Sequence, residues 1–458
     1  MTSPPDTRLA VTQVSTADVG GGAEHVALDL HRSLIARGVD AHLLVGFEHF
    51  PGRAGVARIP NDEMRGAWAT AVGRLVEPLP APPAVLSPAA RLVRQGLKAI
   101  AEPLRAGRVL AGHDDHDFPA TSHLLDLTDR VPDVLHLHNL HGGYFDLRAI
   151  PGLAHRVPVV ATLHDAWLTT GHCAYSVGCE RWLTGCGECP HLGYPPAARG
   201  DRTAQNWRAK RAAFAGARGL IDFVSPSEWT LSRLARSPIA ESVRATHVVR
   251  NGVDLDVFSP AADRAALRAS LGIGRDDRVV AYLAARDDNP YKDAATTREA
   301  LSALAQRWDA AAPPLVLLAI GTDAPAEFAG ARSIGVPYAT DPADVARALQ
   351  VADVLLHAAR AEVFPLMVAE AQAVGLPAVV TDVGGLPEVI VAGESGLVVG
   401  AADAVGAADA LGSILRENVR LAAMSRAARS HAEANLDARS MVDGYLAVYQ
   451  EAIASRTR

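Results

Sequence analysis

The run RLAVTQV at residues 8–14 and the three glycines at 20–22 set the architecture of this chain. The apolar run predicts a buried strand, and the residues from 23 to 36 carry a helical pattern. The run AHLLV at 41–45 predicts a second strand. A strand, a glycine loop, a helix and a strand begin a doubly wound parallel sheet. The glycines would also let a ligand approach the backbone closely.

This alternation of strands and helices runs along the chain and then begins again. Further strands of the first set are predicted at 133–138, 158–163, 223–225 and 247–249. Strands of a second set are predicted at 278–283, 315–319, 352–356 and 378–380. Two such sets predict two Rossmann-like α/β domains that face a cleft, with ligands at the carboxyl ends of their strands.

The sequence divides into predicted domains at a linker-like segment, Phe258-Ser259-Pro260. We predict an N-terminal domain at 1–255 and a C-terminal domain at 260–435. A last helix at 436–458 is expected to cross back and pack on the first domain. Within the first domain, the proline- and arginine-rich residues 51–130 predict an insertion with some helices, and residues 170–195 form a cysteine loop.

Composition is that of a globular protein of two or three domains, with 458 residues and 49% hydrophobic content. No apolar run is long enough to predict a membrane span. The first residues lack the basic and apolar regions of a signal peptide, so we expect a cytoplasmic protein. The net charge of −7 argues against non-specific nucleic-acid binding.

Lysine is rare in this chain, because only Lys98, Lys210 and Lys292 occur among 44 cationic residues. Lys292 follows the predicted strand at 278–283, and so does Arg286. Two cations at a strand end could neutralise a diphosphate leaving group. The alternative is a solvated loop in which these cations pair with neighbouring aspartates.

The run AEVFPLMVAE at residues 361–370 combines a predicted helix start with two glutamates. Pro365 suits the first position of a helix, which places Glu362 in the preceding loop and Glu370 inside the helix. A helix start attracts phosphate, and carboxylates accept hydrogen bonds from sugar and ribose hydroxyls. This segment could therefore bind the phosphate, the sugar and the ribose of a nucleotide-sugar. The alternative is a surface helix with two solvated glutamates.

Histidines cluster where two strands of the first set are predicted to end. His136 and His138 alternate on one strand, His141 follows them, and the pair His164-Asp165 follows the next strand. Histidines in this pattern could chelate a metal, as in a metal-dependent hydrolase. They could also line a substrate cleft without metal, where His164 would meet a substrate hydroxyl or a developing charge.

All four cysteines fall within seventeen positions, with the spacing C-x5-C-x6-C-x2-C. A zinc ion held by four thiolates would order a long loop that has no core of its own. Disulfides and free thiols remain the alternatives. The residues concerned are Cys173, Cys179, Cys186 and Cys189.

Together these segments resemble the retaining glycosyltransferases of family 4, which have the two-domain GT-B fold. The resemblance covers nearly the whole chain, and the cysteines resemble a cysteine-bearing subgroup of that family. The segments that carry it are GGGAE at 20–24, HLHNLHGGY at 136–144, TLHD at 162–165, SPS at 225–227, NGVD at 251–254, the pair of Arg286 and Lys292, and residues 362–370.

The resemblance implies a role for each matching residue. Gly21 and Gly22 would lie against the donor diphosphate and sugar, and His164 would contact the transferred sugar. Arg286 and Lys292 would bind the diphosphate. The remaining donor contacts would come from Glu362 to the sugar hydroxyls, Glu370 to the ribose, and the backbone near Val363, Phe364 and Leu366. On the acceptor side the implied residues are Asn139, His141 and Asp165.

This chain departs from the family pattern at two places. Val363 stands where the family often has glycine, and His357-Ala358 stand where it often has Pro-Ser. Val363 is therefore expected to tighten the sugar pocket.

The function expected is the retaining transfer of a sugar from a UDP- or GDP-linked donor to an acceptor nucleophile, without a catalytic metal. The acceptor, a small molecule or a glycan precursor, is not readable from the sequence, and a homo-oligomer is left open. Competing readings are a nucleotide-sugar epimerase or sugar-phosphate enzyme, a glycosidase using the two glutamates, the metal hydrolase, and a non-catalytic nucleotide-sugar-binding subunit.

Overall fold

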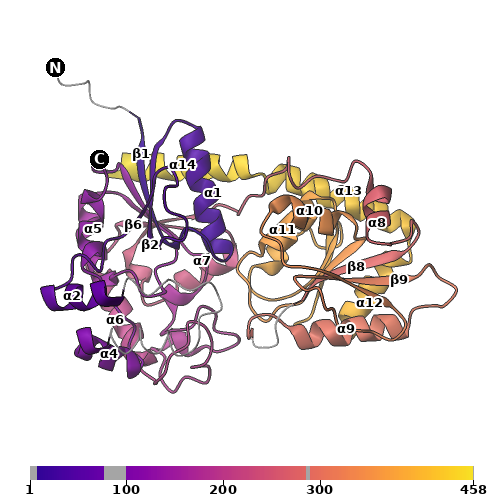
Figure 1. Ribbon diagram of the computed structural model, residues 1–458, viewed down its shortest axis with the longest axis horizontal. Coiled ribbons are helices and arrows are strands. Elements are labelled where there is room, and N and C mark those ends of the chain that lie inside the picture. Colours follow the sequence, from indigo (N-terminus) through magenta and orange to yellow (C-terminus); the bar gives the residue numbers. More distant parts are fainter. Residues whose placement is uncertain (1–7, 77–98, 285–288, 457–458) are drawn as a thin grey trace. The chain divides into compact units, whose positions relative to one another are not determined.

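The structure is a computed structural model that describes residues 8–76, 99–284 and 289–456. These residues form two compact α/β units (Figure 1). The first unit comprises the chain to Ser225 together with Leu231–His247 and Leu446–Arg458. The second comprises Pro226–Thr230 and Val248–Tyr445. The prediction of two Rossmann-like parallel-sheet domains is confirmed.

The first unit is built on a sheet with the strand order β3-β2-β1-β4-β5-β6-β7. Its strands are β1 (Ala10–Ala17), β2 (Asp40–Phe47), β3 (Val56–Arg58), β4 (Val134–Leu137), β5 (Val159–Thr162), β6 (Ile221–Ser225) and β7 (Val243–Val248). Parallel pairing runs from β3 through β6. The strand order reverses between β1 and β4, and ligands of such sheets bind outside the carboxyl ends at that point.

The second unit repeats this order as β10-β9-β8-β11-β12-β13. Its strands are β8 (Arg278–Leu283), β9 (Leu315–Ile320), β10 (Arg332–Val336), β11 (Val354–His357), β12 (Ala378–Thr381) and β13 (Gly396–Val399). Neighbouring strands of this sheet pair in parallel. Its order reverses between β8 and β11, so the loops after these two strands are where a ligand is expected.

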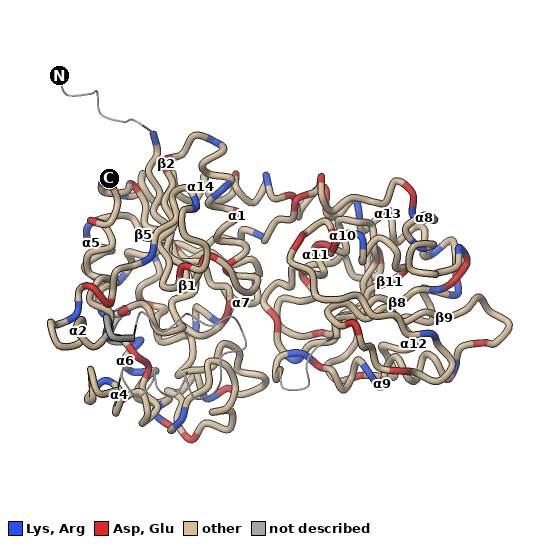
Figure 2. Tube along the Cα trace, viewed as in Figure 1, with Lys and Arg blue, Asp and Glu red and all other residues tan. Residues whose placement is uncertain are grey.

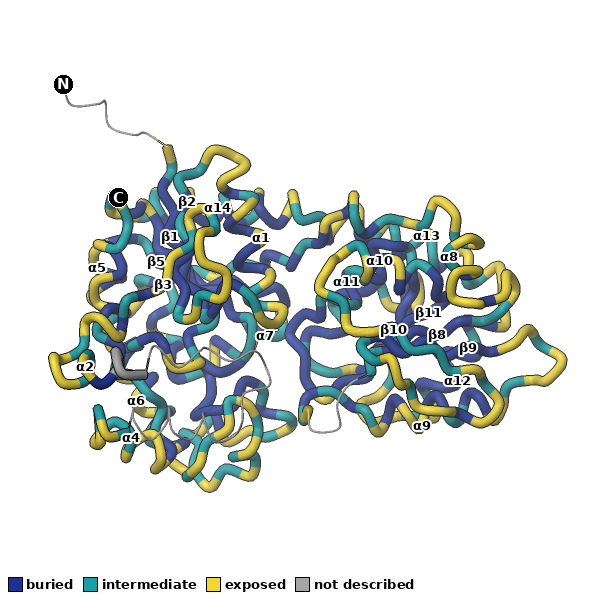
Figure 3. Tube along the Cα trace, in the orientation of Figure 1, coloured by how far each residue is buried: buried dark blue, intermediate teal, exposed yellow. Residues whose placement is uncertain are grey.

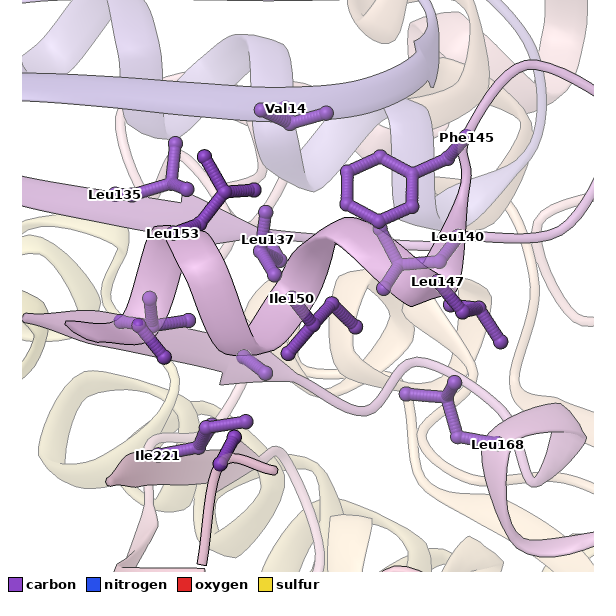
Figure 4. Close-up of a cluster of buried hydrophobic side chains, with 14 of the residues drawn as sticks. Val14, Leu135, Leu137, Leu140, Phe145, Leu147, Ile150, Leu153, Leu168 and Ile221 are labelled. Carbon is purple, nitrogen blue, oxygen red and sulfur yellow. The ribbon is translucent and has the colours of Figure 1, made fainter. Parts of the chain in front are cut away.

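Helices cover the sheet of the first unit. Those in the first half of the chain are α1 (Gly22–Ala36), α2 (Ala67–Val76), α4 (Pro103–Leu110), α5 (Ile150–Arg156), α6 (Thr203–Ala215) and α7 (Glu228–Leu234), of which α7 begins in residues assigned to the second unit. Figure 4 shows Ile150 and Leu153 of α5 lying beside Leu135 and Leu137 of β4. All four side chains are almost completely buried, so this contact forms part of the core.

Helices also cover the sheet of the second unit, and Figure 3 shows buried segments along its strands. The helices of the second half are α8 (Arg264–Ser270), α9 (Ala294–Gln306), α10 (Pro342–Gln350), α11 (Leu366–Ala373), α12 (Ala404–Leu415), α13 (Asn418–Asn435) and α14 (Ala438–Arg456). Leu301 and Leu304 of α9 and Leu411 of α12 are buried in one cluster with the strands. The C-terminal end of α14 belongs to the first unit, where Tyr449 contacts β4.

Within 51–130 the described residues contain β3, α2, α4 and a 3-10 helix, Pro119–Asp126. Acidic and basic residues are interspersed along the described part of the trace (Figure 2). Within the described ranges, no helix combines the length and the apolar character needed to span a bilayer.

Candidate functional site

The loops after β8 and β11 bring Lys292 and Glu362 together in the second unit. Because these strands are parallel neighbours, their carboxyl ends open onto the same edge. A backbone bridge joins Lys292 to Ala359, and Lys292 Nζ donates a hydrogen bond to Glu362 Oε1. The two side chains are 23% and 11% exposed, so the ion pair is largely shielded from water.

His357, the last residue of β11, lies beside the same carboxylate. Its Nε2 is 3.4 Å from Glu362 Oε1. Burial acts to raise the pKa of Glu362, but the charge of Lys292 and the contact with His357 outweigh burial and lower that pKa to about 2. Glu362 is therefore a carboxylate at any physiological pH.

Helix α11 begins at Leu366, and Pro365 is its N-cap. The prediction that Pro365 occupies the first helical position is wrong by one residue, because its ψ of 120° is extended rather than helical. Glu362 lies in the preceding loop and Glu370 lies inside the helix, as predicted. Val363 and Phe364 are buried between them.

Glu370 is partly buried, and its carboxyl group is shielded from water. Burial alone raises the pKa of its carboxyl to about 7. Among the described residues its side chain forms no ion pair. A carboxyl placed this way has acceptor capacity that a ligand with hydroxyl groups could use.

Gly384 and Gly385, which follow β12, fix the loop that carries Glu362. Gly385 N donates to Glu362 O at 3.0 Å. A Cβ at Gly384 would lie 1.9 Å from Glu362 O, and its φ of +59° is one that glycine adopts readily. The sequence signal for this role was present, since a Gly-Gly pair after a strand marks close backbone approach.

We expect Gly384→Ala to destabilise the second unit by about 3 kcal/mol or more, because the new Cβ would displace the Glu362 loop. Gly393→Ala is the matched control. Gly393 also has a positive φ, of +85°, but a Cβ there meets nothing within 4 Å, so its cost should stay near 1 kcal/mol. Chemical denaturation of the two variants measures the difference. Equal losses would show that the close approach is unimportant.

In the first unit, the loop after β1 leads into α1 at Gly22. Gly21 is the N-cap, and its N–H donates to Glu24 Oε2 at 2.9 Å. Both Gly21 and Gly22 are exposed. The helix start lies at the point where this sheet reverses its order, where an anion is expected to bind.

His136 in β4 and His138 directly after it form buried hydrogen bonds with protein groups. His136 Nδ1 lies 2.7 Å from Tyr449 Oη, and its Nε2 lies 2.7 Å from Thr162 Oγ1. His138 also uses both ring nitrogens, toward His164 and Gln13. No group of His, Cys, Asp or Glu among the described residues is arranged to hold a metal. The arrangement gives no support to the metal-hydrolase alternative.

His141 and Asp165 form an ion pair beside the indole of Trp167. His141 Nε2 lies 2.7 Å from Asp165 Oδ2. Burial would lower the pKa of His141, but the Asp165 carboxylate raises it; burial would raise the pKa of Asp165, but His141 lowers it. The backbone oxygen of Asn139 accepts from Thr16 Oγ1 and from Tyr144 Oη. Two of the three predicted acceptor-side residues are thus in direct contact.

The four cysteines are free thiols around one small cavity of about 20 Å³. The disulfide alternative is therefore not seen. Since no group of potential ligands in the described residues is arranged to hold a metal, the structure does not support the predicted zinc site. Burial raises the pKa of Cys173 and Cys186 to about 11, which keeps these thiols protonated.

Lys210 anchors the cysteine loop, a role that sequence reasoning missed. Its side chain is fully buried and lies over the Trp167 ring, 3.5 Å from the ring centre. Lys210 Nζ donates to the backbone oxygens of Trp167 and Thr170, at 2.9 and 3.0 Å. Lys210, one of the three lysines, therefore has a structural role, whereas the phosphate-binding role of Lys292 stays a prediction. Arg286 lies outside the described residues.

Two family models match consecutive parts of this chain. Residues 20–257 match "Glycosyltransferase Family 4", and residues 263–431 match "Glycosyl transferases group 1". A protein of Escherichia coli (strain K12), WcaC, which is named as a colanic acid biosynthesis glycosyl transferase, is 26% identical over 387 residues. That match spans 81% of this chain and 83% of WcaC.

Solved structures with this fold cover almost the whole chain. Sucrose-phosphate synthase from Thermosynechococcus elongatus has a TM-score of 0.60 at 17% identity, covering 98% of this chain and 100% of that one. HepE of Anabaena, solved in complex with UDP-glucose, has a TM-score of 0.58 at 15% identity, with coverage of 98% and 100%. At these identities the likeness concerns the fold.

Proposed function

The chain belongs to glycosyltransferase family 4, and from that premise we propose that it moves a sugar from a nucleoside-diphosphate donor to an acceptor nucleophile with retention of anomeric configuration. The observation that carries the proposal is the Lys292–Glu362 ion pair at the carboxyl edge of the second sheet, with the partly buried acid Glu370 on the helix that follows. This edge offers a cation for phosphate and two carboxylates for hydroxyl groups.

Lys292 and Arg286 are the proposed diphosphate ligands. Breaking the anomeric bond leaves negative charge on the diphosphate oxygen, and a nearby ammonium stabilises that charge most as it develops. The amides at the start of α11 add a partial positive charge at the same edge. Pro365 contributes no N–H, so the backbone donors come from Phe364 and Leu366.

Glu362 and Glu370 are the proposed ligands of the sugar and the ribose, respectively. Each carboxylate oxygen accepts from a hydroxyl group, and two hydroxyls on neighbouring carbons can bind one carboxylate. Glu362 is held ionised by Lys292, which suits it to hydroxyl binding across the physiological range. Val363, buried beside it, is expected to restrict the size of the sugar.

The first unit would supply Gly21 and Gly22 to the donor phosphate and sugar, and His164 to the reacting sugar. In a same-face mechanism the leaving oxygen departs with the bonding electron pair, the acceptor oxygen attacks from that face, and the acceptor proton passes to the departing diphosphate oxygen. This route needs no separate general base and no catalytic metal, because cationic side chains neutralise the leaving group. Asn139, His141 and Asp165 are the proposed acceptor-side residues.

A binding screen with different nucleotides tests which base the donor carries. We expect UDP or GDP at 100 times its dissociation constant to stabilise the folded protein by about 2.7 kcal/mol, seen as a rise in Tm. The corresponding monophosphate is the control, since it offers less charge to Lys292. A protein whose Tm no nucleoside diphosphate changes would not be the transferase proposed here.

Stereochemistry tests the retaining mechanism. With the preferred α-linked donor, we expect the first product formed to be an α-glycoside, read from the coupling constant of its anomeric proton. Recording early turnovers avoids later mutarotation of any hydrolysis product. A β-linked first product would contradict retention while leaving the family assignment in place.

A further inference from the structure

A buried chain of hydrogen bonds ends at His164. His138 Nδ1 lies 2.9 Å from His164 Nε2, and His138 Nε2 lies 3.0 Å from Gln13 Oε1. Gln13 belongs to β1 and His138 directly follows β4, so both stand on the pair of strands where the sheet order reverses. Their side chains are completely buried, whereas His164 keeps some exposure.

Gln13 presents its amide oxygen, Oε1, to His138 Nε2. The amide oxygen can only accept, so His138 Nε2 must carry the proton. Burial lowers the pKa of His138 far below its usual range and that of His164 to about 4, so both rings are neutral and each carries one proton. His138 Nδ1 is then a bare acceptor, and His164 must donate to it from Nε2. The remaining nitrogen, His164 Nδ1, is left without a proton.

We propose that Gln13 and His138 are positioning residues that hold His164 in its Nε2–H tautomer, so that Nδ1 presents a lone pair to a hydroxyl of the transferred sugar. In the described part of the chain, no protein group hydrogen-bonds to His164 Nδ1. A sugar hydroxyl is a donor of the kind this nitrogen needs. The identity of that hydroxyl donor rests on the proposed function, but the tautomer does not.

The neighbouring histidine provides a matched control. His136 is as deeply buried as His138. Its two ring nitrogens contact the hydroxyl groups of Tyr449 and Thr162. A hydroxyl can donate or accept, so neither of these two contacts by itself sets the tautomer of His136. Tyr449→Phe removes a buried hydrogen bond of the same kind without touching the chain that ends at His164.

Nitrogen NMR of the full-length protein, labelled with 15N-histidine, measures the tautomer directly. At pH 7.5 we expect His164 Nε2 to show the shift of a protonated nitrogen and Nδ1 that of a bare one, with the signals assigned from a His164→Gln sample. In Gln13→Met, the proton on His138 Nε2 loses its acceptor. His138 can then adopt its other tautomer, in which Nδ1 carries the proton and donates it to His164 Nε2. We therefore expect a detectable Nδ1–H population at His164 in that variant, and none in Tyr449→Phe.

The fold should tolerate Gln13→Met. The side chains have similar volume, and the substitution also removes Gln13 Nε2, a buried group with no hydrogen-bond partner among the described residues. Thermal unfolding checks this before any kinetic comparison.

Kinetics then test the positioning role. We expect Gln13→Met to lower kcat by about tenfold or more with little change in donor KM, because His164 no longer presents its lone pair correctly. Tyr449→Phe should stay within about twofold of wild type. A protonated Nδ1 at His164 in the wild type, or a fully active Gln13→Met variant, would overturn the proposal. If the predicted tautomer is found in a protein that transfers no sugar from any donor, the proposed function fails instead.

Discussion

Lys292→Met is expected to lower kcat/KM for sugar transfer by about 10²–10³, the loss seen when a single preorganised charge-stabilising group is removed. Methionine keeps the length and apolar volume of the side chain while removing the ammonium that faces Glu362. Because the leaving diphosphate gains charge as the anomeric bond breaks, most of this loss should appear in kcat. Steady-state kinetics with the preferred donor measure it.

Loss of activity through unfolding must be separated from loss of chemistry. Lys292→Met leaves Glu362 buried without its cation, at a cost of roughly 2 kcal/mol for a pair that is shielded but not fully buried. The double variant Lys292→Met/Glu362→Gln removes both charges and should recover most of that stability while remaining inactive. Arg307→Met, which breaks an exposed pair with Asp409, should change neither property. Substantial activity in a folded Lys292→Met protein would refute the diphosphate assignment.

The pair also gives stability a defined pH dependence. Glu362 has a folded pKa of about 2, below its usual value of 4.5, so its contribution is present above pH 4.5 and is lost as the pH falls toward 2. The Lys292→Met variant should not show this loss of stability at acidic pH.

Glu370→Gln is expected to make the protein more stable above pH 7 and a much poorer transferase. The folded pKa of Glu370 is about 7, raised from 4.5 by burial. Between these values the folded protein keeps a proton that the unfolded chain has lost, so stability falls as the pH rises from 4.5 through 7. At pH 8 the buried carboxylate therefore costs at most roughly 3 kcal/mol, which a neutral glutamine avoids.

The affinity for the donor should change with pH in the opposite direction to stability. Ribose hydroxyls donate to the carboxylate, so donor binding favours the ionised form and should weaken as the pH falls below about 7. Glutamine offers one acceptor in place of two charged oxygens, and we expect kcat/KM to fall about 10²-fold. Denaturation at pH 4.5 and pH 8 and calorimetric titration of the nucleotide measure the two effects.

An exposed glutamate in the same unit serves as the comparison. Glu394→Gln should alter neither the pH dependence of stability nor nucleotide affinity. Should Glu370→Gln bind nucleotide as tightly as wild type at pH 8, the ribose assignment would be wrong.

Central strands of both sheets were predictable from sequence, whereas the edge strands β3, β10 and β13 were not predicted and only the last residues of the edge strand β7 were. Strands such as β9 are fully buried on both faces and read as continuous apolar runs. β10, by contrast, has the sequence RSIGV and is half-exposed, while β3 and β13 have three and four residues. Short or half-exposed edge segments carry no periodic signal that separates them from loops.

The candidate site was predictable in its residue types but not in its contacts. Rarity singled out Lys292, and the helix-start pattern singled out Glu362 and Glu370. That Lys292 pairs with Glu362, 70 positions away, depends on the sheet order and could not be read from spacing. Gln13 was passed over for the same reason, since its partner His138 lies 125 positions along the chain.

The Lys292–Glu362 pair also bears on which solutes can compete for this edge in a cell. Inorganic phosphate could pair with the Lys292 ammonium. The shielded Glu362 carboxylate would then have no cation and would also be repelled by the phosphate. A free monosaccharide could donate hydrogen bonds to the Glu362 carboxylate, but it would leave the Lys292 ammonium without an anion. In the proposed donor site, a molecule that carries both a phosphate and a sugar would separate the pair and give each partner a new contact. The ion pair would then disfavour the binding of abundant metabolites that carry only one of these groups.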